Sequence, residues 1–180
     1  VYSRHEDTAT AFAAKNHAQA SYTDYRDMLQ QADLDVVYLA SPNSVHFEQA
    51  MQAIAHDISV IVEKPAFSNR QEMIAVQAAL AQHPQVKFFE AARHVHTPNF
   101  HAIEKALAGL TTVQGAALTY MKYSSRYDDV LAGGTPNVFT PEFSGGALQD
   151  LGVYPIYLAI ALFGEPVDVA YYPTLIATGA

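Results

Sequence analysis

Three short apolar runs stand between longer stretches of mixed polarity in the first half of the chain. The run from Asp35 to Ala40 predicts a strand buried on both faces, and Ile58 to Val62 predicts a second buried strand. Val86 to Ala91 predicts a third. The first two runs end in turn-forming residues, Ser41-Pro42-Asn43 and Glu63-Lys64-Pro65, which place the carboxyl end of each strand.

Helical patterns fill the intervals between these runs. We expect four helices, over residues 8–16, 25–31, 44–56 and in the amphipathic stretch that follows residue 68. Asp7 is the expected N-cap of the first helix, and Asp24 or Thr23 that of the second. Ser68 and Gln71 form a capping-box pattern for the fourth. Strands that alternate with helices through short connections predict a parallel α/β sheet over residues 1–94.

The second half has a different texture and predicts a separate, truncated α+β domain over residues 95–180. Its expected elements are helices at 98–107 and 150–163, strands at 112–123 and 167–176, and an irregular loop at 128–146. Gly109 and Gly164 are expected to end the two helices. The chain starts with an end-of-strand pattern, Val1 to Arg4, and ends in an apolar stretch. We therefore expect an internal piece of a longer protein.

Composition and charge remove several function classes. The 180 residues include no cysteine, which excludes disulfides, thiol catalysis and thiolate metal sites. The 10 basic and 18 acidic residues give a net charge of −8, so we expect no nucleic-acid partner. No run approaches the ~18–20 apolar residues of a membrane span, so no membrane partner is expected. No signal-peptide pattern follows Val1, and we expect a cytoplasmic location.

Polar residues follow the predicted strands where a doubly wound sheet binds its ligands. Arg4, Ser41-Pro42-Asn43 and Glu63-Lys64-Pro65 would all lie at the carboxyl edge of one sheet. The ordinary alternative is that each is only a polar turn. A Gly-x-Gly-x-x-Gly phosphate turn is absent among the nine glycines. Its expected position lies before Val1, so its absence does not count against dinucleotide binding.

Four segments together resemble the Gfo/Idh/MocA oxidoreductase family. They are residues 35–46, 63–65, 90–98 and 145–155, and the resemblance extends over nearly the whole chain in the family's order and spacing. It implies a partial Rossmann domain followed by a domain with a mostly antiparallel sheet, whose face commonly mediates homo-oligomers. The implied reaction is hydride transfer between NAD(P) and a secondary alcohol or carbonyl of a sugar, polyol or diol.

Lys64, Asp150 and Tyr154 are the expected catalytic residues. A lysine between a buried strand and a proline is partly desolvated, so we expect a lowered pKa for Lys64 and a hydrogen bond to the substrate oxygen. Asp150 and Tyr154 share one helical face. Most of the family has histidine at the position of Tyr154. The resemblance to glucose–fructose oxidoreductase and dihydrodiol dehydrogenase implies a tyrosine there, as the proton carrier tuned by Lys64, with Asp150 orienting or balancing charge.

The expected cofactor contacts lie along the same edge of the sheet. They are Ser3, Arg4, Ser41, Pro42, Asn43, His46, Glu63 and Lys64. Arg4 after the expected strand end favours NADP, because an arginine accommodates a ribose 2′-phosphate where an acid would accept a 2′-hydroxyl. The acids Glu6 and Asp7 follow closely, so NAD stays open. Glu63 resembles the family's position beside the nicotinamide ribose; its alternative is a surface salt bridge.

Arg93 and His94 are expected to line the substrate side of the cleft. Together with His96 and His101 they also suggest a metal site, but no neighbouring acid completes one and hydride transfer needs no metal, so we expect none. Tyr154 has an alternative role as a packing residue. For the whole protein the alternative is a catalytically silent dinucleotide-binding regulator of the same family.

Overall fold

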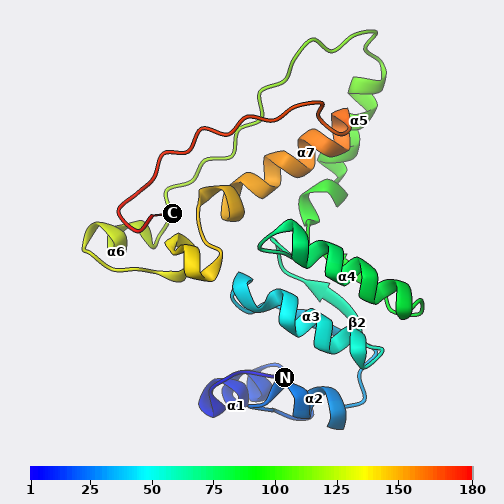
Figure 1. The fold of residues 1–180 in the computed structure, drawn as a ribbon, viewed down its shortest axis with the longest axis vertical. Helices are drawn as coiled ribbons and strands as arrows, with labels where there is room; N and C mark the ends of the chain where they lie inside the picture. Colours follow the sequence, from blue (N-terminus) through cyan, green and yellow to red (C-terminus); the bar gives the residue numbers. More distant parts are fainter. Residues whose placement is uncertain (180) are drawn as a thin grey trace. The chain divides into compact units, whose positions relative to one another are not determined.

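A computed structural model of the chain describes residues 1–179 (Figure 1). The fold divides into two compact units that interleave along the sequence. The first unit comprises residues 1–40, 45–62 and 69–89, and the second comprises residues 41–44, 63–68 and 90–180. The predicted domain boundary between residues 94 and 95 stays a prediction, since the turns after the strands cluster with the second unit although they lie early in the chain.

The first unit is built on a three-stranded sheet in the order β1-β2-β3, with strands Val36–Leu39, Ser59–Val62 and Phe88–Glu90. β1 and β2 pair in parallel, with Val36 opposite Ser59. The crossover helices are α3 (His46–Ala55) and α4 (Arg70–Gln82), which contact each other, and α3 also contacts both β1 and β2 (Figure 1). The predicted parallel α/β sheet is confirmed.

Alternate strand residues form the core of this unit. Val37, Leu39, Val60 and Val62 are buried, together with Ile54 of α3. Each such side chain stabilises the fold by roughly 1.5–3 kcal/mol relative to its exposed state.

The other face of β1 is open. Val36 and Tyr38 are 47% and 57% exposed, so the prediction that residues 35–40 are buried on both faces is wrong. The reason lies in the connections: successive right-handed crossovers in one direction place their helices on the same face of a sheet. Side chains alternate between the two faces of a strand, so Val36 and Tyr38 lie on the face opposite to that of the buried Val37 and Leu39.

Helix α1 (Glu6–Lys15) begins two residues earlier and ends one residue earlier than predicted. Its N-cap is His5, and Asp7 lies inside the first turn, where its carboxylate still interacts favourably with the helix dipole. Helix α2 (Tyr25–Gln31) has the predicted bounds and is capped by Asp24, whose side chain accepts hydrogen bonds from two backbone N–H groups. Before α1, Tyr2 forms a parallel bridge with Tyr22.

Helix α4 starts with a capping pair that lies one residue beyond the predicted one. The Asn69 side chain accepts from the Glu72 backbone N–H at 3.1 Å and donates to the Glu72 carboxylate at 2.9 Å. The predicted pair Ser68 and Gln71 does not cap the helix. Asn69 is an equally good N-cap, and the Ser68 hydroxyl is engaged by Ser144 instead.

The second unit consists of helices and irregular chain. Its α-helices are α5 (Pro98–Ala108), α6 (Tyr127–Leu131) and α7 (Val153–Phe163). Shorter turns are η1 (Asn43–Val45, which crosses into the first unit), η2 (Arg93–His96), η3 (Asn137–Phe139), η4 (Pro141–Phe143) and the π-helical turn η5 (Leu148–Gly152). The helices predicted at 98–107 and 150–163 are confirmed, and Gly109 and Gly164 follow them as predicted.

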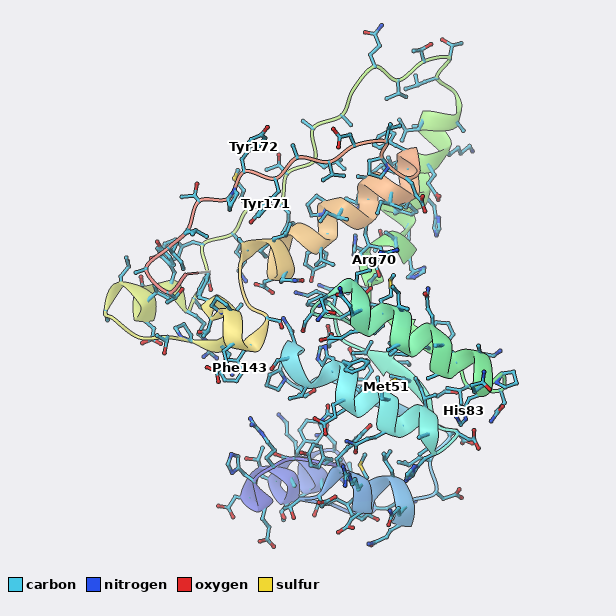
Figure 2. All side chains as sticks on the ribbon, in the orientation of Figure 1. Met51, Arg70, His83, Phe143, Tyr171 and Tyr172 are labelled. Carbon is cyan, nitrogen blue, oxygen red and sulfur yellow. The ribbon has the colours of Figure 1, made fainter. Side chains whose placement is uncertain are left out.

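The two strands predicted in this unit are wrong. Residues 112–123 and 167–176 have no strand structure, and no antiparallel sheet occurs within residues 1–179. Met121 is 84% and Tyr172 is 89% exposed, and Figure 2 shows Tyr171 and Tyr172 on this last extended segment. β-Branched and aromatic residues favour strands only where a neighbouring strand and a packed face are available. The predicted homo-oligomer contact through such a sheet stays a prediction.

One helical stretch, Pro141–Phe163, is long and apolar enough to cross a bilayer by length and composition. The sequence count had found no such run, because the stretch is interrupted by polar residues, among them Glu142 and Asp150. Asp150 forms an ion pair with Lys64 in the second unit. Length and composition alone do not make a membrane span, and the expectation of no membrane partner stays a prediction.

Candidate active site

The turn after β2 carries Lys64 into the second unit. Pro65 and Ala66 are buried, and the Lys64–Pro65 peptide bond is cis. The Lys64 side chain is only 16% exposed. Lys64 is thus followed by two buried residues, and its aliphatic stem can extend away from them. The ammonium group can then contact polar groups of other segments of the second unit.

The Lys64 ammonium has two acceptors on one residue. Its Nζ atom donates to the Asp150 carboxylate at 2.9 Å and to the Asp150 carbonyl oxygen at 2.8 Å. Asp150 belongs to η5, the π-helical turn before α7, and such turns often occur at functional sites. The structure thus brings together two predicted residues that lie 86 positions apart in the sequence.

Tyr154 completes this group. It lies in the first turn of α7, four positions after Asp150, and its ring centroid is 5.0 Å from the Lys64 Nζ atom. That distance is within the ~6 Å range of a cation–π interaction. The three residues predicted to be catalytic therefore form one contiguous cluster within the second unit.

The protonation of Lys64 differs from the prediction. Burial by itself lowers the pKa of the ammonium, but the hydrogen bond and negative charge of Asp150, with smaller contributions from Tyr154, outweigh it and raise the pKa above its ordinary value. The predicted lowering of the Lys64 pKa is wrong, because it considered desolvation without the paired carboxylate. At neutral pH Lys64 is an ammonium ion, which stabilises negative charge and does not accept a proton.

His94 of η2 packs against the same helix. Its Nε2 atom is 3.1 Å from the Tyr154 carbonyl oxygen, and since a carbonyl only accepts, Nε2 carries the hydrogen. The ring meets those of Tyr154 and Tyr157 edge-on, at 4.9 and 5.7 Å between centroids. Burial, followed by the charges of His96 and Arg93, lowers the pKa of His94, so the imidazole is neutral. The predicted substrate contacts of His94 and Arg93 stay predictions.

Glu90, at the end of β3, is a residue that the sequence reasoning missed. One carboxylate oxygen accepts the backbone N–H of Ala66 at 2.7 Å, and the other accepts the hydroxyl of Tyr157. The position of Glu90 at the carboxyl end of the third parallel strand was a signal that could have found it, because the other strand ends had been singled out for that reason.

Ser144 joins two turns of the second unit and was also missed. Its hydroxyl donates to the Ser68 hydroxyl at 2.6 Å, and its carbonyl oxygen accepts the Asn43 side-chain amide at 3.1 Å. The next residue, Gly145, lies so close to residues 137–138 that a Cβ atom there would be 2.5 Å from the Asn137 carbonyl oxygen. This close approach explains the glycine and sets the chain's path into η5.

The remaining predicted cofactor residues are distributed over both units. Ser41 and Pro42 are half-buried beside Asn43 in the second unit, and Glu63 is half-buried before Lys64. In the first unit Ser3 is half-buried, Arg4 is exposed, and His46 is fully buried at the start of α3. Their contacts with a cofactor stay predictions. Within residues 1–179, no three His, Asp or Glu side chains gather as a metal site would require.

Comparison with known proteins defines the class. Residues 1–91 match the Gfo/Idh/MocA group, described as an oxidoreductase family with an NAD-binding Rossmann fold. That is half of the chain, and the match includes β1, β2 and the Lys64 turn. The chain belongs to the Gfo/Idh/MocA oxidoreductase family, as the sequence motifs had indicated.

Two curated relatives have high identity over almost the whole chain. The oxidoreductase YgjR of Escherichia coli (strain K12) is 41% identical over 179 residues, 99% of this chain and 54% of the relative. The scyllo-inositol 2-dehydrogenase (NADP(+)) IolU of Bacillus subtilis (strain 168) is 42% identical over 169 residues, 94% of this chain and 51% of the relative. The chain spans about half the length of these relatives.

Solved structures share the fold. The WlbA dehydrogenase from Bordetella pertussis, in complex with NADH and UDP-GlcNAcA, superposes with a TM-score of 0.76 at 20% identity, covering 91% of this chain and 46% of that one. An NAD binding oxidoreductase from Klebsiella pneumoniae gives a TM-score of 0.71 at 27% identity, covering 91% and 43%. At 20% identity the first likeness speaks for the fold alone.

Proposed function

We propose that the protein containing this chain is an NAD(P)-dependent dehydrogenase that interconverts a secondary alcohol and a carbonyl of a sugar, polyol or diol. The observation that carries the proposal is the cluster of Lys64, Asp150 and Tyr154, with 2.9 Å between the ammonium and the carboxylate and 5.0 Å between the ammonium and the aromatic ring. A relative at 42% identity is a scyllo-inositol 2-dehydrogenase, which supports a polyol as substrate.

The cluster divides the proton chemistry between two residues. Oxidation of an alcohol requires a group that takes the hydroxyl proton. Lys64 is already protonated, because Asp150 raises its pKa against the opposing effect of burial, so Lys64 cannot take this proton. We assign the proton to Tyr154, which accepts it as a phenolate and becomes the neutral phenol, with the Lys64 ammonium beside the phenolate ring. The Lys64 charge stabilises the negative charge that develops on oxygen. A unit charge about 4 Å away contributes on the order of 4 kcal/mol at an effective dielectric constant of ~20.

The neighbours of the cluster keep it in place. Asp150 holds the Lys64 ammonium through two hydrogen bonds and offsets its charge. The neutral His94 ring donates to the Tyr154 backbone carbonyl and packs against the Tyr154 ring, so it restrains both the helix and the side chain. Because His94 is uncharged, it adds no second cation beside Lys64.

The donor set of the second unit fits the nicotinamide end of an NAD(P) molecule. Ser41, Asn43 and Lys64 offer a hydroxyl, an amide and an ammonium in turns that follow parallel strands, the position where open α/β sheets bind dinucleotides. When bound, the cofactor supplies the hydride acceptor for the reaction. In the first unit, Arg4 is exposed after the Tyr2 bridge, which supports NADP over NAD. Three relatives have NADP(+) in their names.

The test is a hydride-transfer assay on the full gene product, with NADP+ and NAD+ and a panel of inositols, aldoses and diols. Lys64→Ala is expected to lower turnover by about 10²–10³-fold, the usual loss for a charge-stabilising donor, with cofactor affinity changed only a few-fold. Lys105→Ala, an exposed lysine of α5, is the matched control.

Three outcomes would contradict parts of this proposal. Turnover that survives Lys64→Ala would remove Lys64 from the mechanism. A wild-type protein that binds NADP+ without any hydride transfer would favour a silent dinucleotide-binding regulator instead. A clear preference for NAD+ over NADP+ in the same assay would overturn the cofactor assignment.

A further inference from the structure

Glu90 makes contacts on two sides. It is half-buried, and its two carboxylate oxygens each accept one hydrogen bond: Oε1 from the Ala66 backbone N–H at 2.7 Å, and Oε2 from the Tyr157 hydroxyl. Ala66 and Tyr157 both belong to the second unit, as Glu90 does. One ionisable side chain therefore links the turn after β2 to helix α7.

The two partners of Glu90 lie beside two residues of the proposed active site. Ala66 is buried and lies two positions after Lys64, in the same turn after β2. Tyr157 is three positions after Tyr154, one helical turn along α7. Asp150, Tyr154 and Tyr157 thus share one helix face, at spacings of four and three.

These contacts close a ring. Lys64 binds Asp150, the helix face runs from Asp150 to Tyr157, and Glu90 returns from Tyr157 to Ala66 beside Lys64. Besides Glu90, the long, flexible Lys64 side chain connects the lysine turn to this helix face. Hydrogen bonds to a carboxylate are roughly twice as strong as neutral ones, which makes this second link a firm one.

We propose that Glu90 is a positioning residue, which holds Lys64 at its working distance from Tyr154 through the Ala66 N–H and the Tyr157 hydroxyl. The inference rests on the proposed dehydrogenase function. The reacting groups of an active site must be held to within about 0.5 Å, and a displacement of about 1 Å can cost on the order of 10²-fold in rate. Glu90 need not touch the substrate to have this effect.

Three variants separate the contacts of Glu90. Glu90→Ala removes both. Tyr157→Phe removes only the hydroxyl and keeps the ring that packs against His94. Glu90→Gln is the conservative variant, because its amide oxygen still accepts from Ala66 and its amide N–H₂ can donate to the Tyr157 oxygen. Tyr172→Phe, at a tyrosine that is 89% exposed, is the matched control for loss of a phenol.

In the full gene product, Glu90→Ala is expected to lower kcat by about 10- to 100-fold, as misplacement of a catalytic group does, and Tyr157→Phe by about three- to tenfold. Glu90→Gln should restore most of the rate. The primary deuterium isotope effect on kcat should rise in the first two variants, because hydride transfer then limits turnover. The Kd for NADP+ by calorimetry should stay within about twofold, a readout that does not depend on turnover.

A structural role would give a different pattern. If Glu90→Ala lowers the Tm while the kcat of the folded protein and the isotope effect match those of Tyr172→Phe, the positioning role is overturned. If Glu90→Ala does not fold, the same comparison with Tyr157→Phe decides. A wild-type protein without hydride transfer would overturn both proposals. Normal turnover, lost in Lys64→Ala but kept in Glu90→Ala and Tyr157→Phe, would overturn this one alone.

Discussion

The contacts within the first unit differ in kind from the contacts within the second unit. The first has a parallel sheet whose buried residues alternate along β1 and β2, and α3 packs on that face. The second has no sheet within its described residues, and much of what connects its turns and helices is polar: Lys64 with Asp150, Glu90 with Ala66 and Tyr157, Ser68 with Ser144. Apolar burial defines one unit, and directed hydrogen bonds define the candidate site in the other.

This difference between the units explains why some segments predicted to be strands form strands and others do not. In the first unit β1 and β2 are neighbours joined by one crossover helix. Their buried residues lie opposite each other in the sheet, since Val37 pairs with Val60 and Leu39 with Val62. In the second unit residues 112–123 and 167–176 also contain several β-branched and aromatic residues but have no strand structure. Strand formation depends on a partner and a packed face, not on composition alone.

The largest expected contrast is in stability. Ile54→Ala, at a buried residue of α3, should lower the free energy of unfolding by about 2–5 kcal/mol through lost burial and a residual cavity. Met121→Ala, at a residue that is 84% exposed, should change it by less than about 0.5 kcal/mol. Denaturant unfolding of both variants measures the contrast. Comparable losses would show that residues 112–123 pack as firmly as the sheet does.

A smaller effect is expected where the second unit depends on a close backbone approach. Gly145→Ala puts a Cβ atom 2.5 Å from the Asn137 carbonyl oxygen and 2.7 Å from the Val138 backbone, so the loop must shift. We expect a loss of about 1–3 kcal/mol in stability, the range for overpacking, together with reduced turnover because the loop leads into η5 and Asp150.

Gly115→Ala is the matched control, since nothing lies within 4 Å of the added atom. Thermal unfolding and the hydride-transfer assay together test this prediction. If Gly145→Ala unfolds and turns over like Gly115→Ala, the close approach does not constrain the site.

The smallest effect concerns pH. Burial, with the charges of His96 and Arg93, lowers the pKa of His94 below its ordinary value of 6.5. At pH values between 6.5 and the lowered pKa, His94 binds more protons in the unfolded chain than in the folded one. The contribution of His94 to the free energy of unfolding therefore decreases as the pH falls through this range. His94→Gln should weaken the loss of Tm on acidification more than His56→Gln does, which is a control at an exposed histidine that does not contribute to the lowered His94 pKa. Identical pH profiles for the two variants would contradict a half-buried, neutral His94.

Much of the first unit could be read from local pattern. The Asp24 cap, the bounds of α2 and the parallel order of β1 and β2 follow from turn chemistry and periodicity over short distances. The same local pattern could not show that Val36 and Tyr38 are exposed, because the face on which the crossover helices lie depends on how the connections wind. It also placed the cap of α4 at Ser68, whose hydroxyl is engaged by a residue 76 positions away.

For the candidate site, too, some features could be predicted from the sequence and others depended on tertiary contacts. The sequence singled out Lys64 by its place at a strand end, a local feature, and the resemblance of four segments to the family implied the roles of Asp150 and Tyr154. Tertiary contact decided that the Lys64 pKa is raised and not lowered, since the Asp150 carboxylate comes from 86 positions away. It also decided that Glu90 links the lysine turn to α7, because a carboxylate acquires its role from the donors that folding brings to its two oxygens.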